Sequence, residues 1–118
     1  MGMNMLFSKK AKIGFHLDKN EDNDQTIKTD AGKVRPTLVE SSLIREVAKV
    51  RMYGVAKYGD RENWSKVEVE RYRDALYRHW LAYLDGETVD KESGLSHLSH
   101  MACNLMFLIK LEERKKEE

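Results

Sequence analysis

An apolar stripe at helical spacing near the end of the chain constrains the fold more than any other feature. The stripe comprises Leu95, Leu98, Met101, Ala102, Leu105, Leu108 and Ile109. Because these positions recur every three or four residues, they predict an amphipathic helix over 95–113. Apolar residues at the same spacing predict two earlier helices, over 38–57 and 67–85. We therefore expect an all-α fold with a three-helix core.

Three helices of this size cannot cover all of their own apolar surface. The chain has 118 residues, which is enough for one domain with a small core. Exposed apolar faces favour association, so we expect a helical-bundle homo-oligomer, a dimer or larger. The balance of 21 Lys+Arg against 20 Asp+Glu gives no strong field for a nucleic-acid polymer or a membrane surface.

The two ends of the chain differ in composition from its middle. Residues 1–28 are mostly polar and show no sustained period, which predicts an irregular arm that is poorly ordered or docks on the oligomer. Residues 29–113 form the expected domain, and 114–118 form a charged tail. The apolar runs are too short for a membrane span or a signal peptide. A single cysteine, Cys103, is typical of a reducing compartment, so we expect a cytoplasmic protein.

Three of the four histidines fall in the third of the chain between Arg71 and Asn104. His97 and His100 stand three residues apart on one predicted helix, and His79 lies on the core side of the preceding one. With nearby carboxylates they suggest a divalent-metal site, and a mixed shell of this kind suits Mn²⁺, Fe²⁺, Co²⁺, Ni²⁺ or Zn²⁺ better than Mg²⁺. Two alternatives remain open: the histidines bind phosphate directly, or they are structural.

Cations and aromatic residues accompany the histidines. Lys57, Arg61 and Arg78 supply the positive charge that phosphate recognition needs. The segment 58–64 combines tyrosine, arginine, asparagine and tryptophan, which together can stack a base and hydrogen-bond its edge. Packing in the core is the competing interpretation of Trp64. Glu46 borders the first apolar stripe, where a ligand and a solvated carboxylate are equally consistent with its position.

These residues recur in motifs that resemble the phage and bacterial dATP/dGTP diphosphohydrolase family, which is distantly related to the all-α nucleotide pyrophosphohydrolases of MazG type. The resemblance covers residues 29–111. Its motifs are Gly32-Lys33-x-Arg35-Pro36, Lys57-Tyr58-Gly59-Asp60-Arg61 with Asn63-Trp64, Ala75-Leu76-x-Arg78-His79 with Gly86-Glu87, and Asp90-x-Glu92-Ser93-Gly94-Leu95-x-His97-Leu98-x-His100 with Cys103-Asn104-Leu105.

The resemblance implies an all-helical, oligomeric, metal-dependent enzyme. It would split dATP or dGTP into the monophosphate and pyrophosphate, in the host cytoplasm if a phage encodes it. The metal would be Mg²⁺ or Mn²⁺, with Co²⁺, Ni²⁺ or Zn²⁺ open because His97-x-x-His100 stands where the broader MazG pattern has ExxD. The roles carried over are catalysis by His79, His97 and His100, metal binding by these three and Glu46, phosphate binding by Lys57, Arg61 and Arg78, and base or sugar binding by Tyr58, Asn63, Trp64 and Asn104.

Two functions of other classes stay open on the sequence. A protein that binds a nucleotide without cleaving it would sequester a metabolite or signal, and it would need Trp64, Arg61 and Arg78 but no metal. A helical interaction protein would use its histidines only for packing.

Overall fold

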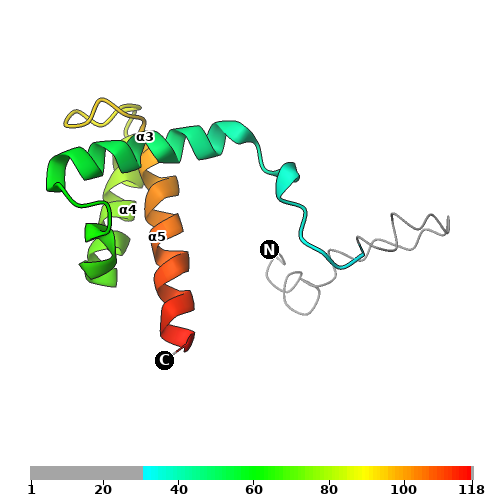
Figure 1. Cartoon of the computed structure of the whole chain (residues 1–118). Helices are drawn as coiled ribbons and strands as arrows, with labels where there is room; N and C mark the ends of the chain where they lie inside the picture. The colour runs from blue at the N-terminus through cyan, green and yellow to red at the C-terminus, as the bar shows by residue number, and fades with distance from the viewer. Residues whose placement is uncertain (1–30, 118) are drawn as a thin grey trace. The chain divides into compact units, whose positions relative to one another are not determined.

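A computed structural model describes residues 31–117, which fall in two units, 31–39 and 40–117. In the first unit Pro36–Leu38 forms the short 3₁₀ helix η2, and all of its residues are exposed. The second unit contains three α-helices and one 3₁₀ helix. They are α3 (Ser41–Tyr58), η3 (Asn63–Lys66), α4 (Val69–Leu84) and α5 (His97–Glu117) (Figure 1). The predicted arm over 1–28 lies outside the described residues.

The all-helical prediction is confirmed for residues 31–117, which contain three α-helices and no strand. The first helix begins at Ser41 rather than at residue 38, because Leu38 belongs to η2. It ends where Gly59 adopts a left-handed φ of 74°, a conformation that glycine tolerates without strain. The third helix continues four residues beyond its predicted end at residue 113, to Glu117. The basic side chains of its last turn favour the helix because they face the negative end of its dipole.

α5 is the central element of the second unit, since it packs against both α3 and α4. Figure 1 shows α5 running beside α4 and meeting α3 near its own first turns. The buried apolar residues are Val50, Cys103 and Phe107, with Trp64 and Tyr72 partly buried against them. This core is small, and many large apolar side chains remain exposed on all three helices.

None of the helices in the described part of the chain combines the length and the apolar content needed to cross a membrane.

Candidate active site

The segment between α4 and α5 is a tightly bonded loop that projects polar side chains toward both neighbouring helices. Residues 89 and 96 form an isolated antiparallel bridge. The backbone N–H of Asp90 donates to the Leu95 carbonyl at 2.8 Å, and that of His97 donates to the Thr88 carbonyl at 3.0 Å. Ser96 then caps α5, since its hydroxyl oxygen accepts the N–H of Leu98 at 3.0 Å. These hydrogen bonds therefore fix the backbone positions of Asp90 and His97.

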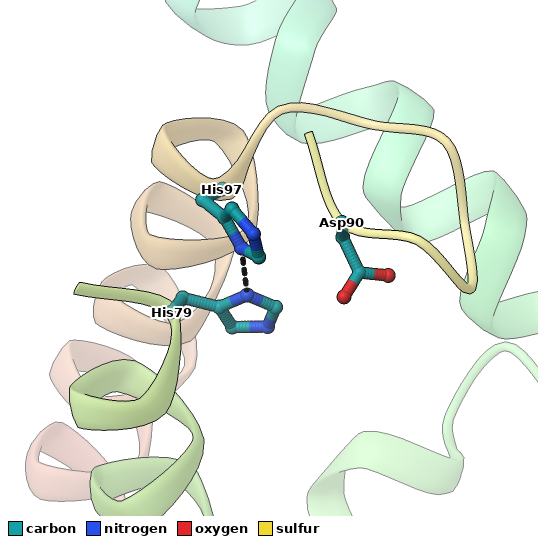
Figure 2. A group of neighbouring side chains, drawn as sticks. All are labelled: His79, Asp90 and His97. Atoms are coloured by element: carbon teal, nitrogen blue, oxygen red, sulfur yellow. Dashed lines mark hydrogen bonds between the residues drawn. The ribbon is translucent and has the colours of Figure 1, made fainter. Parts of the chain in front are cut away.

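Three side chains in contact with one another, those of Glu87, His97 and His79, connect this loop to α4. Nδ1 of His79 lies 2.8 Å from Nδ1 of His97 (Figure 2). Nε2 of His97 lies 2.7 Å from a carboxylate oxygen of Glu87. His97 is only 3% exposed, so both of its ring nitrogens have partners within the protein.

Asp90 lies beside the two imidazoles. One ligand atom each from His79, Asp90 and His97 can be chosen so that all three lie within 4.8 Å of one another. The backbone N–H of Ser93 donates to the Asp90 carboxylate at 2.8 Å and fixes its orientation. The three groups come from α4, the loop and the first turn of α5, as Figure 2 shows.

His100 completes the cluster from the next turn of α5. Its ring stacks on that of His79, with centroids 4.5 Å apart and planes 6° from parallel. Its Nε2 lies 2.7 Å from the Ser93 hydroxyl and 3.9 Å from an Asp90 oxygen. The spacing of three residues predicted from the sequence thus places His97 and His100 in one cluster.

Burial and mutual repulsion keep the imidazoles of His79 and His100 uncharged. Burial, then the nearby His100 and His97, lowers the pKa of His79 to about 4. Burial also lowers the pKa of His100, although the Asp90 carboxylate opposes this effect. Burial acts to raise the pKa of Asp90, but the hydrogen bonds from Ser93 and the nearby histidines outweigh it and lower that pKa overall. Near neutral pH, His79 and His100 are neutral and Asp90 is ionised.

This combination fits a divalent transition metal. Neutral imidazole nitrogens and an ionised carboxylate are the forms that bind metals, and two nitrogens with one oxygen suit Mn²⁺, Fe²⁺, Co²⁺, Ni²⁺ or Zn²⁺. The carboxylate of Glu87 behind His97 is the outer partner that metal-binding histidines commonly have.

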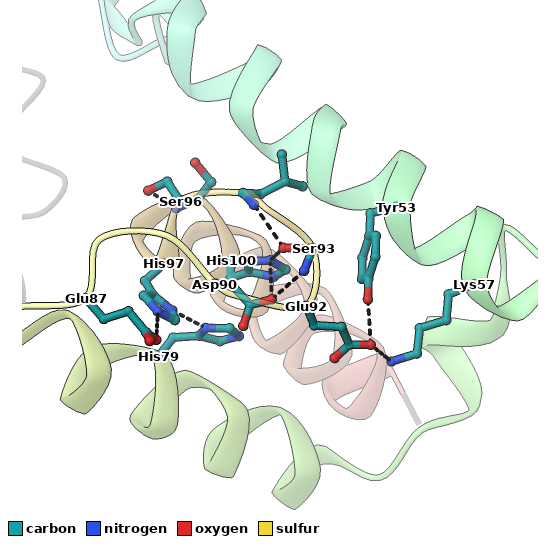
Figure 3. A network of polar contacts seen from close by, with 12 residues as sticks. Tyr53, Lys57, His79, Glu87, Asp90, Glu92, Ser93, Ser96, His97 and His100 are labelled. Carbon is teal, nitrogen blue, oxygen red and sulfur yellow. Dashed lines mark hydrogen bonds and ion pairs between the residues drawn. The ribbon is translucent and has the colours of Figure 1, made fainter.

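A second carboxylate ties the loop to α3. One oxygen of Glu92 accepts hydrogen bonds from the Tyr53 hydroxyl and from Nζ of Lys57, each at 2.6 Å (Figure 3). The hydrogen bond with Glu92 raises the pKa of Lys57, which stays protonated, and the hydrogen bonds from Lys57 and Tyr53 lower the pKa of Glu92. Glu92 therefore joins the loop that carries Asp90 to the middle of α3.

The cluster opens into a cleft of about 740 Å³ between the helices. Its inner wall is apolar and aromatic. Trp64 stacks on Phe107 with centroids 5.0 Å apart and planes 7° from parallel, and the Tyr72 hydroxyl donates to the Trp64 carbonyl at 2.6 Å. Four cations line the same cleft: Arg51, Lys57, Lys66 and Arg71. A cleft with an aromatic end, cations and a polar cluster has the features of a nucleotide site.

Asn104 is the unusual polar residue of this cleft. It lines the cleft and is 8% exposed, yet its side chain makes no hydrogen bond to any residue between 31 and 117. Buried amides normally have partners, because an unpaired one costs free energy. Asn104 lies one helical turn after His100 and one before Phe107.

Seven of the residues predicted from the sequence line the cleft, namely Lys57, Tyr58, Asn63, Trp64, His79, His100 and Asn104. His97 lies behind His79. Trp64 packs against the core, as one interpretation predicted, and it also lines the cleft.

Three predicted residues are placed elsewhere. Glu46 accepts a hydrogen bond from Ser99 at 2.8 Å and pairs with Lys49 at 2.8 Å, outside the histidine cluster. The side chain of Arg61 is 80% exposed, with Nε 3.9 Å from a carboxylate oxygen of Glu62, and its backbone carbonyl accepts a hydrogen bond from Arg51 at 2.6 Å. Arg78 is exposed on α4 and does not line the cleft.

The carboxylates Glu87, Asp90 and Glu92 are functional candidates that the sequence reasoning did not assign to the site. They lie in the motifs of the resemblance, but loop residues carry no periodicity that would indicate which way they point. The sequence feature that could have indicated them is the cluster of three acidic residues between two predicted helices that carry histidines.

Comparisons with known proteins give consistent results. A family model described as dATP/dGTP diphosphohydrolase, N-terminal, matches residues 23–118. A protein of Salmonella phage PMBT28 named dATP/dGTP diphosphohydrolase is 42% identical over 82 residues, which cover 70% of this chain and 28% of that relative. The chain therefore spans less than a third of the length of this relative. No solved structure matches the chain.

Proposed function

Because the chain belongs to the dATP/dGTP diphosphohydrolase N-terminal family, we propose that its cleft binds a purine deoxynucleoside triphosphate and hydrolyses it to the monophosphate and pyrophosphate. The family membership confirms the resemblance indicated by the motifs. The observation that carries the proposal is the contact between a His79–Asp90–His97 group and a cleft lined by cations and aromatic rings.

The metal is proposed to be a divalent transition ion held by His79, Asp90 and His97. When bound, it would supply positive charge to the phosphate oxygens and make water more acidic. Mn²⁺ is the first candidate, because it accepts both imidazole and carboxylate ligands and also binds phosphate oxygens. Glu46 remains a predicted ligand only for a conformation in which it leaves Ser99.

The substrate is proposed to lie along α5, with its phosphates at the histidine end and its base at the aromatic end. His100, Asn104 and Phe107 succeed one another along one stripe of α5, and a helix rises roughly 1.5 Å per residue. From His100 to Phe107 the stripe thus spans roughly 10 Å, comparable to the reach from the α-phosphorus to a base. Trp64 and Tyr58 would contact the base, and Asn63 and Asn104 the base or sugar.

Lys57 is proposed to bind the triphosphate after exchanging its Glu92 partner for phosphate oxygens. Arg71 is the second candidate because it lines the cleft and its nearest carboxylate, on Glu68, is 3.9 Å away. Arg61 and Arg78, which were predicted for this role, would need to reach in from outside the cleft.

In the proposed reaction, the oxygen of a water molecule bonds to the α-phosphorus. The bond from that phosphorus to the bridging oxygen breaks, and pyrophosphate leaves with the electron pair. His100, which is neutral near pH 7 because its pKa is lowered, accepts the proton of the water at Nε2. Lys57 stabilises the charge that develops on the phosphates.

The test is to incubate the protein with ribo- and deoxynucleoside triphosphates and Mg²⁺, Mn²⁺ or Co²⁺, and to separate the products by chromatography. The proposal predicts monophosphate and pyrophosphate from dATP or dGTP. Replacing His97 and His100 by alanine should abolish hydrolysis. If the wild type instead retains an intact nucleotide, and the double variant still binds it, sequestration replaces hydrolysis as the function.

We also propose a homo-oligomer in the cytoplasm, acting on a small-molecule nucleotide and not on a nucleic-acid polymer. The support is the amount of exposed apolar side chain on α3, α4 and α5 and the near balance of charge.

A further inference from the structure

Glu87 lies outside the cleft, and its effect on the ring protons of His97 and His79 has not been considered so far. We infer that it is a positioning residue: by accepting a hydrogen bond from His97, it sets the tautomers of both His97 and His79. The geometry of the three side chains carries this inference, and its consequence for metal binding rests on the function proposed above.

The first step concerns the contact between Glu87 and His97. A carboxylate can only accept, so Nε2 of His97, 2.7 Å away, must carry the proton. Nζ of Lys91 lies 3.6 Å from the other oxygen of the same carboxylate.

The second step follows from the first. In the neutral tautomer that carries its proton on Nε2, Nδ1 of His97 has a free electron pair. The facing atom, Nδ1 of His79 at 2.8 Å, must then donate. Donation from Nδ1 leaves Nε2 of His79 without a proton and able to accept or to bind a cation, and Nδ1 of His97 binds a cation only when it gives up this hydrogen bond.

The third step concerns where that electron pair lies. His79 lines the cleft, whereas His97 does not. Asp90 lies beside His79 in the same group and also lines the cleft. The carboxylate of Glu87, which does not line the cleft, thereby determines which ring nitrogen of His79 is basic. Without Glu87 the two rings can exchange donor and acceptor roles, and His79 then loses the fixed tautomer.

The inference is tested first in the protein without metal or nucleotide. Long-range ¹H–¹⁵N NMR at mildly alkaline pH distinguishes protonated from unprotonated ring nitrogens of neutral histidines. We expect the proton on Nε2 of His97 and on Nδ1 of His79. A proton on Nδ1 of His97, or on Nε2 of His79, overturns the inference.

Two substitutions test the role of the carboxylate, E87A and E87Q, with E70Q as the matched control because Glu70 is an exposed α4 residue whose partner is Arg73. In both Glu87 variants the ¹⁵N shift of His97 Nε2 should move toward its unprotonated value, since neither side chain obliges that atom to donate. Unchanged shifts in both overturn the inference. E87Q keeps the size of the side chain, so the test survives if E87A fails to fold.

Titration with Mn²⁺ alone measures the consequence. Loss of an outer partner of a metal-binding histidine typically weakens metal binding about 10- to 100-fold, and we expect this range for E87A and no change for E70Q. If E87A binds Mn²⁺ as tightly as the wild type, Glu87 has no positioning role. The NMR result does not depend on hydrolysis, so a failure of the proposed reaction is distinguishable from a failure of this inference.

Discussion

At the scale of single residues, Asn104 links the stability of the fold to ligand binding. Its amide is buried in the cleft without a partner among residues 31–117, and an unpaired buried amide costs about 1–3 kcal/mol. Leucine has a similar size and no polar atoms. We expect N104L to raise the free energy of unfolding by about 1 kcal/mol, measured by urea unfolding. We also expect it to raise the KM for the nucleotide about 10-fold, measured by steady-state kinetics. A less stable variant with an unchanged KM would contradict this role.

His79 predicts a dependence of stability on pH. Its pKa in the folded protein, about 4, lies below the ordinary value of 6.5. Between these values the unfolded chain binds a proton and the folded chain does not, so stability is fully present above about pH 6.5 and is lost as the pH falls toward 4. Urea unfolding across this range should show a loss on the order of 2 kcal/mol. His79→Gln should have a much shallower slope, and an equal slope in both proteins would exclude His79 as the cause.

Asp90 should matter for metal binding rather than for folding. Its carboxylate accepts hydrogen bonds from Ser93, including one from the backbone N–H, which an amide oxygen can still accept. Asp90→Asn therefore should fold, and should weaken Mn²⁺ binding at least 10-fold because the ion loses an anionic ligand. Isothermal titration calorimetry measures the affinity, with Asp74→Asn as the control on the same unit. Equal affinities for Asp90→Asn and the wild type would remove Asp90 from the site.

At the scale of elements, the α4–α5 loop is the part that brings the site together. Glu92 connects it to Tyr53 and Lys57 on α3. Since the Glu92 side chain is 62% exposed, we expect Glu92→Gln to leave the free energy of unfolding nearly unchanged. Hydrogen exchange in residues 86–95 should nevertheless accelerate. Glu113→Gln, which disrupts an exposed pair with Lys110, is the control, and equal exchange in both variants would show that Glu92 does not hold the loop.

Helices and loop differ in how far the sequence predicts them. The periodic apolar residues predicted three helices whose ends moved by at most four residues, because burial of one face is what makes such segments helical. The same period placed His97 and His100 together. It could not place the side chain of Glu46, which borders an apolar stripe and can turn either way. Nor could it place Asp90 and Glu87, because their positions depend on turn hydrogen bonds and not on periodicity.

At the scale of the whole molecule, the exposed apolar surface predicts self-association. Tyr77, Leu81 and Leu84 share one face of α4 and are 65%, 55% and 58% exposed. We expect light scattering to give a mass that is a multiple of the chain mass. Leu81→Glu should shift it toward the monomer, because a buried unpaired charge is costly, whereas the control Arg73→Glu should not. A wild-type monomer at micromolar concentration would contradict the prediction.

The cleft is proposed to direct water to the α-phosphorus of a purine deoxynucleoside triphosphate. The most direct test is hydrolysis of dGTP or dATP with Mn²⁺ in ¹⁸O-labelled water, followed by mass spectrometry of the products. Attack at the α-phosphorus predicts one ¹⁸O atom in the monophosphate and none in the pyrophosphate. Label in pyrophosphate or inorganic phosphate, or complete recovery of the intact nucleotide, would contradict the account.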